Sequence, residues 1–155
     1  MNIALGCDHA GFPLKKLLHA WLEKKGYKVL NLGVDTDEVP ADYPDYARAV
    51  AEAVAAGKAE RGIIVCGSGV GATIAANKVP GVRGCMCHDT FSARQGVEDD
   101  DMNVLCLGGR IIGQELAYEV LNAFLNAKFS GLDRHKRRKD KVTAIERTYS
   151  KEAVK

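Results

Sequence analysis

The sequence has no apolar run near the roughly 18 residues that a membrane-spanning helix requires. Its first residues contain no basic segment followed by an apolar one, so we expect no signal peptide. The five cysteines are an odd number, and in a chain that is not secreted we expect them to be free thiols in a reducing cytosol. These absences predict a cytoplasmic protein with no membrane partner.

The motifs that usually hold a metal ion are also missing. The chain has no Cys-x-x-Cys and no His-Glu-x-x-His, and Cys85 and Cys87 have no second pair. The acidic run at 98–101 is more typical of a solvated surface than of a cation site. Aromatic residues make up only 6% of the chain, and from residue 134 onward Tyr149 alone could stack on a nucleic-acid base. We therefore expect no metal and no nucleic-acid partner.

The 155 residues suit a single domain that covers 1–155, in which strand-like and helix-like segments alternate. Short apolar runs predict strands at 3–7, 29–32, 63–66, 82–87 and 103–107. Helical patterns lie between and after them, at about 13–25, 45–56, 90–97 and 114–128, and a further helix follows the glycine-rich 67–71 and runs through Ile74 and Ala76. This alternation predicts an α/β fold in which a five-stranded parallel sheet has helices on both faces.

The net charge of +2 hides a basic C-terminal segment, since residues 128–155 hold ten Lys or Arg against four Asp or Glu. We expect a basic helix at about 134–153, outside the five-unit alternation. Because this helix has few apolar residues, it has little to bury alone, and we expect it to pack on a partner subunit. A solvated basic face is the simpler alternative.

In an open parallel sheet, ligands bind beyond the carboxyl ends of the strands. The loop Gly67-Ser68-Gly69-Val70-Gly71 follows the third strand there and leads directly into a helix. It is not a Walker A loop, because Gly-Lys-Ser/Thr is missing at its end. It fits a loose dinucleotide fingerprint, with Asp89 at about the right distance, but it follows the third strand.

A third interpretation makes Cys66, the last residue of the third strand, the reactive group. A thiol beside a helix N-terminus ionises more easily than a free one. Its thiolate could abstract a carbon-bound proton while the N–H groups of the glycine loop stabilise enediolate oxygens. The alternative is that Cys66 is a small buried residue that fills the end of a strand.

Other polar residues lie where the same crevice is expected. Asp8 and His9 follow the first strand and could bind sugar hydroxyls or move a proton, or they could form an ordinary polar turn. Tyr43 could close over a ligand or be a plain loop aromatic. Arginines suited to a phosphate, with a histidine beside them, are Arg110, Arg134, His135 and Arg138.

Together these motifs resemble one family. The motifs are 6–11 (Gly-Cys-Asp-His-Ala-Gly), 42–44 (Asp-Tyr-Pro), 66–71 (Cys-Gly-Ser-Gly-Val-Gly), 75–78 (Ala-Ala-Asn-Lys) and 134–135 (Arg-His). In this order, over about 1–148, they resemble ribose-5-phosphate isomerase type B, a family that includes galactose-6-phosphate isomerase subunits. The resemblance implies a Rossmann-like three-layer sandwich, no metal or organic cofactor, and a homodimer or dimer of dimers with shared active sites. It also implies a small phosphorylated sugar as the partner and interconversion of ribose 5-phosphate and ribulose 5-phosphate in the pentose phosphate pathway.

The resemblance also implies roles for individual residues. Cys66 matches the base that moves the proton between C2 and C1, and Ser68 matches a residue that assists proton movement between oxygens. Members without this cysteine use a Glu just after the loop, where this chain has Ala72. The positions that match substrate-binding residues are Asp8, His9, Tyr43, Gly67, Gly69, Val70, Gly71, Asp100, Arg110, Arg134, His135 and Arg138.

One position departs from the family pattern. Asp99 stands where the family usually has the histidine that opens the sugar ring. A carboxyl group is normally ionised at pH 7 and has no proton to donate. Asp99 could still open the ring as a catalytic residue, His9 or His135 could replace it, the substrate could differ, or the activity could be impaired. The alternative functions are isomerisation of allose or galactose 6-phosphate, or non-catalytic binding of a sugar phosphate or nucleotide.

Overall fold

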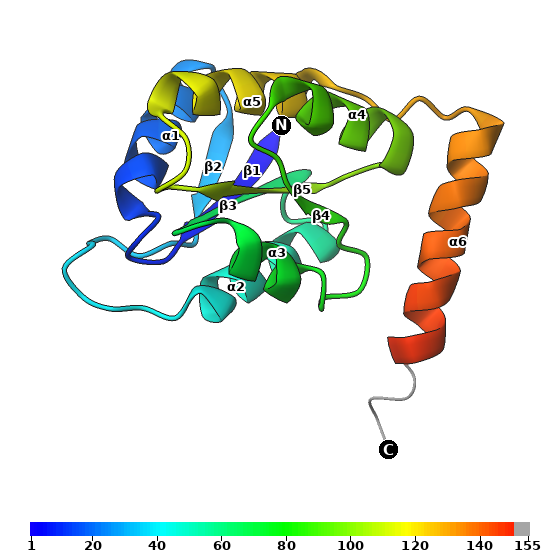
Figure 1. The fold of residues 1–155 in the computed structure, drawn as a ribbon, viewed down its shortest axis with the longest axis horizontal. Helices are drawn as coiled ribbons and strands as arrows, with labels where there is room; N and C mark the ends of the chain where they lie inside the picture. The colour runs from blue at the N-terminus through cyan, green and yellow to red at the C-terminus, as the bar shows by residue number, and fades with distance from the viewer. Residues whose placement is uncertain (151–155) are drawn as a thin grey trace.

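The computed structural model describes residues 1–150, which fold into three layers with a parallel sheet between two layers of helices (Figure 1). The strands are β1 (Asn2–Cys7), β2 (Lys28–Asn31), β3 (Arg61–Cys66), β4 (Gly84–Met86) and β5 (Val104–Gly108). They lie in the order β2-β1-β3-β5-β4, and every pair is parallel. The predicted α/β fold with a five-stranded parallel sheet is confirmed, and β3 is its central strand.

The helices that join the strands cover both faces of the sheet. They are α1 (Phe12–Lys24), α2 (Tyr43–Ala55), α3 (Val70–Ala76), α4 (Thr90–Asp100) and α5 (Gln114–Asn126). Alternate residues of a strand point to opposite faces, so Ile63 and Val65 pack with α1, α4 and α5. Ile64 and Cys66 pack with α2 and α3 on the other face. The sulfur of Cys66 therefore lies on the face that α3 covers.

Among the element boundaries that differ from the prediction, two have a clear physical reason. The fourth strand is shorter than 82–87, because Gly81 has a φ of 85° and the Val82 N–H bonds to the Val79 carbonyl, which closes a turn. The second helix begins at Tyr43 rather than near 45, since Pro44 suits the first turn of a helix. Tyr43 is thus a helical residue and not a loop aromatic.

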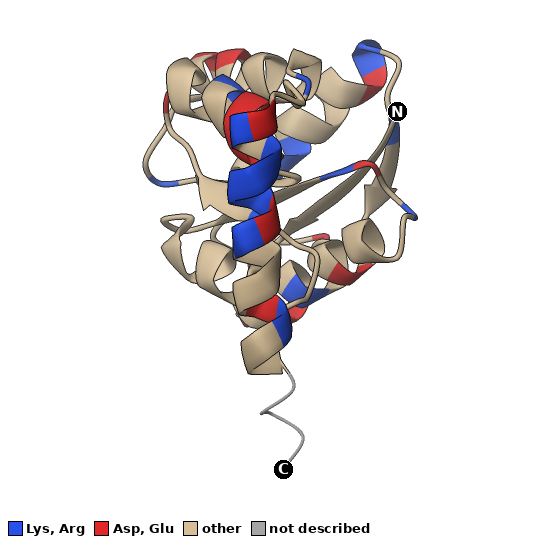
Figure 2. Cartoon of the chain, turned by 90° about the vertical axis from the view of Figure 1, so that its right-hand side faces the viewer, with Lys and Arg blue, Asp and Glu red and all other residues tan. Residues whose placement is uncertain are grey.

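The C-terminal helix α6 (Asp133–Ser150) begins near the predicted start, whereas 151–153 of the predicted helix lie outside the described residues. Among its 18 residues only His135 is buried. Figure 2 shows α6 in front of the body with many basic residues along it. Its carboxylate Glu146 accepts hydrogen bonds from the Gly81 N–H at 3.0 and 3.1 Å. Within residues 1–150, no helix combines the length and the apolar character needed to cross a bilayer.

Candidate active site

A pocket of about 400 Å³ opens at the carboxyl ends of β1, β3 and β5, where the topology predicts a ligand site. We call it the thiol pocket. Its lining residues are Asp8, His9, Ala10, Tyr43, Cys66, Gly67, Ser68, Gly71, Arg110 and Ile111. Eight of these were predicted as site residues from the sequence, and they come from four separate segments of the chain. The fold therefore brings the central part of the predicted site together.

Cys66 lies at the base of this pocket with only 4% of its surface exposed. Its sulfur accepts a hydrogen bond from the Gly69 N–H at 3.2 Å. Gly69 has a φ of 85°, a conformation that favours glycine and that turns this N–H toward the sulfur. This backbone donor holds the Cys66 sulfur in place at the base of the thiol pocket.

The other buried thiols have no such pocket. Burial raises the pKa of Cys7 to about 11 and that of Cys106 to about 12. Cys85 is exposed, and a hydrogen bond with Cys87 lowers the pKa of Cys85 to about 7. The structure thus separates a protected thiol in the thiol pocket from a reactive thiol on the surface.

Backbone hydrogen bonds hold the glycine loop against the end of β5. The Gly109 N–H donates to the Cys66 carbonyl at 2.8 Å, and the Arg110 N–H donates to the Gly67 carbonyl at 3.1 Å. The Ser68 hydroxyl accepts a bond from the Val70 N–H at 3.3 Å. These contacts place the exposed Arg110 side chain at the mouth of the thiol pocket.

Tyr43 closes one side of the pocket by packing its ring on Gly71. A Cβ atom at Gly71 would lie 2.6 Å from the Tyr43 Cζ, so only glycine allows this contact. The Asp8 carboxylate, which also lines the pocket, accepts a bond from the Gly11 N–H at 2.9 Å. His9 Nδ1 lies 3.0 Å from the nitrogen of Ala41 and 3.2 Å from its oxygen. Asp8, His9 and Tyr43 are therefore held by contacts within the chain.

A second group contains three predicted residues, Asp99 on α4 and Arg134 and His135 on α6. Together with their partners Gln95 and Ser130, we call them the α4–α6 cluster. Gln95 Nε2 donates to Asp99 Oδ2 at 2.7 Å, and Asp99 Oδ1 lies 3.4 Å from His135 Nδ1. Ser130 Oγ lies 2.7 Å from the same nitrogen, and Arg134 Nε donates to His135 Nε2 at 3.0 Å. This network fixes one arginine beside a buried imidazole.

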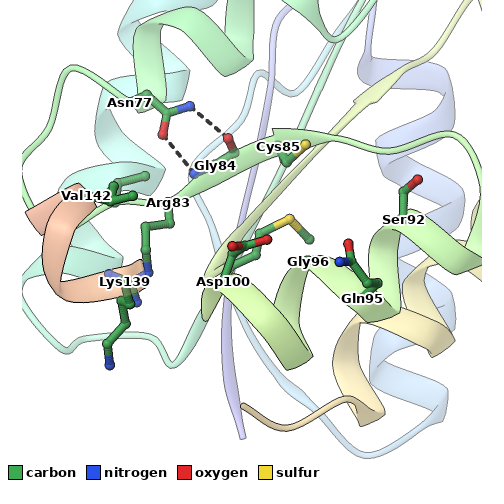
Figure 3. Close-up of a pocket in the computed structure, with 12 residues that line it drawn as sticks. Asn77, Arg83, Gly84, Cys85, Ser92, Gln95, Gly96, Asp100, Lys139 and Val142 are labelled. Atoms are coloured by element: carbon green, nitrogen blue, oxygen red, sulfur yellow. Dashed lines mark hydrogen bonds between the residues drawn. The ribbon is translucent and has the colours of Figure 1, made fainter. Parts of the chain in front are cut away.

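Asp100 and Arg138 belong to neither group. Asp100 lines a second pocket of about 470 Å³ between β4, α4 and α6, with Cys85, Gln95 and Lys139 (Figure 3). Arg138 is exposed on α6, as is Arg134. The second pocket and the thiol pocket share no lining residue. Within one described chain, the predicted site residues therefore do not form a single pocket.

Three contacts of these regions were not predicted. The bond between His9 and Ala41 spans 32 positions, and nothing in the sequence indicates it. Ser130 lies five residues before His135 in an irregular segment, which gives no periodic signal. Gln95 lies four residues before Asp99 on a helix, so this pair could have been found from its spacing.

No group of three potential metal-ligating side chains occurs within residues 1–150.

The parallel sheet, the glycine loop and the polar groups at the strand ends define an α/β enzyme with a thiol in its site. Comparison with known proteins then identifies its family. A family described as Ribose/Galactose Isomerase matches residues 3–142. The chain belongs to this family and is an isomerase.

Individual relatives agree with the family match over nearly the full chain. Ribose-5-phosphate isomerase B of Escherichia coli (strain K12) is 45% identical over 145 residues, which cover 94% of this chain and 96% of that protein. D-erythrulose-4-phosphate isomerase of Pectobacterium atrosepticum is 44% identical over 132 residues, 84% of this chain and 86% of that protein. The structure of Clostridium thermocellum ribose-5-phosphate isomerase B matches with a TM-score of 0.93 at 44% identity, covering 96% of this chain and 99% of that chain.

Proposed function

We propose that the chain interconverts ribose 5-phosphate and ribulose 5-phosphate through an enediolate. The observation that carries this proposal is the Cys66 sulfur at the base of the thiol pocket, held by the Gly69 N–H at 3.2 Å. The 45% identity to a ribose-5-phosphate isomerase B over 94% of the chain supports the choice of sugar.

In the proposed reaction, the Cys66 thiolate removes the proton from C2 of the open-chain aldose. The electron pair moves into a C1–C2 double bond, and the N–H groups of the loop from Gly67 to Gly71 stabilise the negative oxygen. Ser68 assists proton movement between the two oxygens. The Cys66 thiol then returns its proton to C1, which gives the ketose and restores the thiolate. The reaction needs no redox partner, because the sugar carries both the oxidised and the reduced carbon.

We infer that a second copy of this chain completes the site, as a cytoplasmic homodimer or a dimer of dimers. Asp99, Asp100, Arg134, His135 and Arg138 do not line the thiol pocket of their own chain. In addition, α6 has a single buried side chain, which leaves most of its surface free to cover a partner. In this arrangement the exposed arginines of α6 would bind the phosphate in the partner's thiol pocket.

Complementation tests the shared site. Each of the variants Cys66→Ala and Arg134→Ala is expected to be inactive alone. When the two variant chains are mixed and reassembled, each heterodimer has one site in which both residues are the original ones. Random pairing then restores about a quarter of the wild-type rate, because about half of the dimers carry one working site of two. A mixture no more active than its components would show that each site belongs to one chain.

Proton exchange tests the reaction itself. In D₂O, the protein is expected to exchange a C1 proton of ribulose 5-phosphate for deuterium, followed by NMR. Cys66→Ala is expected to slow this exchange by about 10³-fold, the scale of a lost general base. Cys85→Ser is the matched control, since it removes an exposed thiol outside the thiol pocket. Exchange that persists in folded Cys66→Ala would exclude Cys66 as the base.

A four-carbon sugar phosphate is the second candidate substrate. Two observations favour it: Asp99 replaces the expected ring-opening histidine, and a D-erythrulose-4-phosphate isomerase is 44% identical. Erythrose 4-phosphate cannot form a five-membered ring, because the hydroxyl that would close it carries the phosphate. Comparing kcat/KM for erythrose 4-phosphate, ribose 5-phosphate, allose 6-phosphate and galactose 6-phosphate decides between them. We expect ribose 5-phosphate to give the highest value.

A further inference from the structure

The chain has four histidines, and their surroundings leave one of them able to act on a substrate in the thiol pocket. His19 lies on α1 and pairs with Glu23. His88 Nε2 accepts a hydrogen bond from the Gly108 N–H at 2.9 Å, which uses its acceptor for the end of β5. Both nitrogens of His135 are occupied, and the residue is only 3% exposed. His9 alone among them lines the thiol pocket together with Cys66.

Asp99, which replaces the histidine expected from the family pattern, is placed to accept hydrogen bonds. Its Oδ2 receives the Gln95 amide at 2.7 Å, and its Oδ1 faces His135 Nδ1 at 3.4 Å. Both carboxylate oxygens of Asp99 are therefore engaged by residues of its own chain, and neither is left free for a sugar.

The backbone of Ala41 offers His9 both a hydrogen-bond donor and an acceptor. Its N–H lies 3.0 Å from His9 Nδ1 and its carbonyl oxygen lies 3.2 Å from the same nitrogen. When Nδ1 is unprotonated it accepts from the N–H, and when it is protonated it donates to the carbonyl. Nδ1 therefore keeps a partner in either state, and no partner for Nε2 is found within residues 1–150.

We propose that His9 opens the furanose ring of the aldose phosphate, a step that rests on the isomerase function proposed above. With Nδ1–H donating to Ala41, His9 Nε2 takes the proton from the anomeric hydroxyl. The C1–O1 double bond forms as the bond from C1 to the ring oxygen breaks, and that bond's electron pair goes to the ring oxygen. The imidazolium then gives its Nε2 proton to that oxygen. The imidazole returns to its starting state, and the open-chain aldehyde remains beside Cys66.

Measuring the reaction from ribose 5-phosphate and from ribulose 5-phosphate separates ring opening from enolisation. Ribulose 5-phosphate cannot close a five-membered ring, because its C5 hydroxyl carries the phosphate, so its C1 exchange in D₂O needs no ring opening. Ribose 5-phosphate must open before it can enolise. His9→Gln retains a hydrogen-bonding amide but cannot carry a proton from one oxygen to another. We expect His9→Gln to lower kcat from ribose 5-phosphate by about 10²-fold more than it lowers C1 exchange of ribulose 5-phosphate.

Three comparisons make the experiment decisive. His19→Gln is the matched control and is expected to change neither readout, since His19 lies outside the thiol pocket. In His9→Ala, free imidazole is expected to restore turnover of ribose 5-phosphate, which a merely structural role would not produce. Asp99→Asn is expected to affect both readouts equally or not at all.

The outcomes distinguish this proposal from the proposed function. Equal losses of turnover and exchange in His9→Gln, or separation of the two readouts by Asp99→Asn instead, would overturn the role of His9. No C1 exchange in the wild type, or full exchange in Cys66→Ala, would overturn the enolisation mechanism first.

Discussion

The thiol pocket and the α4–α6 cluster hold their polar groups in different ways. In the thiol pocket, backbone atoms make the decisive contacts: the Gly69 N–H on Cys66, the Gly11 N–H on Asp8 and the Ala41 peptide on His9. In the α4–α6 cluster, side chains hold one another, and Arg134 remains exposed. A site built from backbone is fixed by the fold itself, whereas one built from side chains can change through single substitutions. Asp99, which stands where the family resemblance predicts a histidine, lies in the second region.

The largest expected effect is on stability, at the close backbone contact between Gly11 and the central strand beside the thiol pocket. A Cβ atom at Gly11 would overlap the carbonyl of Val65, which is bonded into the central strand and cannot move aside. We expect Gly11→Ala to lower the free energy of unfolding by about 3 kcal/mol or more, measured by denaturant titration. Gly113→Ala is the control, because no atom of residues 1–150 other than those of Gly113 and its chain neighbours lies within 4 Å of its Cβ position. Equal stability of the two variants would show that the pocket backbone is not rigid.

An intermediate effect, on the KM for ribose 5-phosphate, is expected for Arg134→Lys in the α4–α6 cluster. Lysine keeps the charge but loses the Nε donor to His135 and the planar fork that suits a phosphate. We expect KM for ribose 5-phosphate to rise about tenfold while kcat changes little, measured by steady-state kinetics. Arg137→Lys, on the exposed surface of the same helix, serves as the comparison. A loss confined to kcat would mean that Arg134 acts in the chemical step.

The smallest effect on activity concerns the surface thiol. Because the pKa of Cys85 is lowered to about 7, it becomes a thiolate as pH rises through neutrality, and iodoacetamide is expected to label it half-maximally near pH 7. Cys66 is nearly buried and is expected to label more slowly, and still more slowly with substrate present. Cys85→Ser should remove the fast reaction, as mass spectrometry of the labelled peptides would show, and leave turnover unchanged. Fast labelling that persists in Cys85→Ser would assign it to another thiol.

Much of the fold and of the thiol pocket was predictable because both depend on local patterns. The apolar runs of β1, β3 and β5 are buried along nearly their whole length, so their composition alone indicates central strands. The rule that ligands bind at the carboxyl ends of parallel strands then placed Asp8, Cys66 and Arg110 together. β4 was less predictable, because a turn at Gly81 shortened it and no apolar pattern records such a turn.

The side-chain contacts of the site were not predictable to the same extent. Ala41 has no polar side chain, so only the path of the segment before α2 reveals that its peptide holds His9. The role of Asp99 depends on Gln95 and His135, which come from two different helices. Such contacts arise from tertiary packing, and residue types at a spacing cannot specify them.

Helix α6 has one further consequence, which concerns how cooperatively the chain unfolds. With a single buried side chain in 18 residues, little packing opposes the opening of its backbone hydrogen bonds. Its amide hydrogens should therefore exchange with solvent far sooner than those of β3, in a chain whose sheet remains intact. If association covers α6, the same amides become slow to exchange as the protein concentration rises, so amide exchange would report subunit assembly residue by residue.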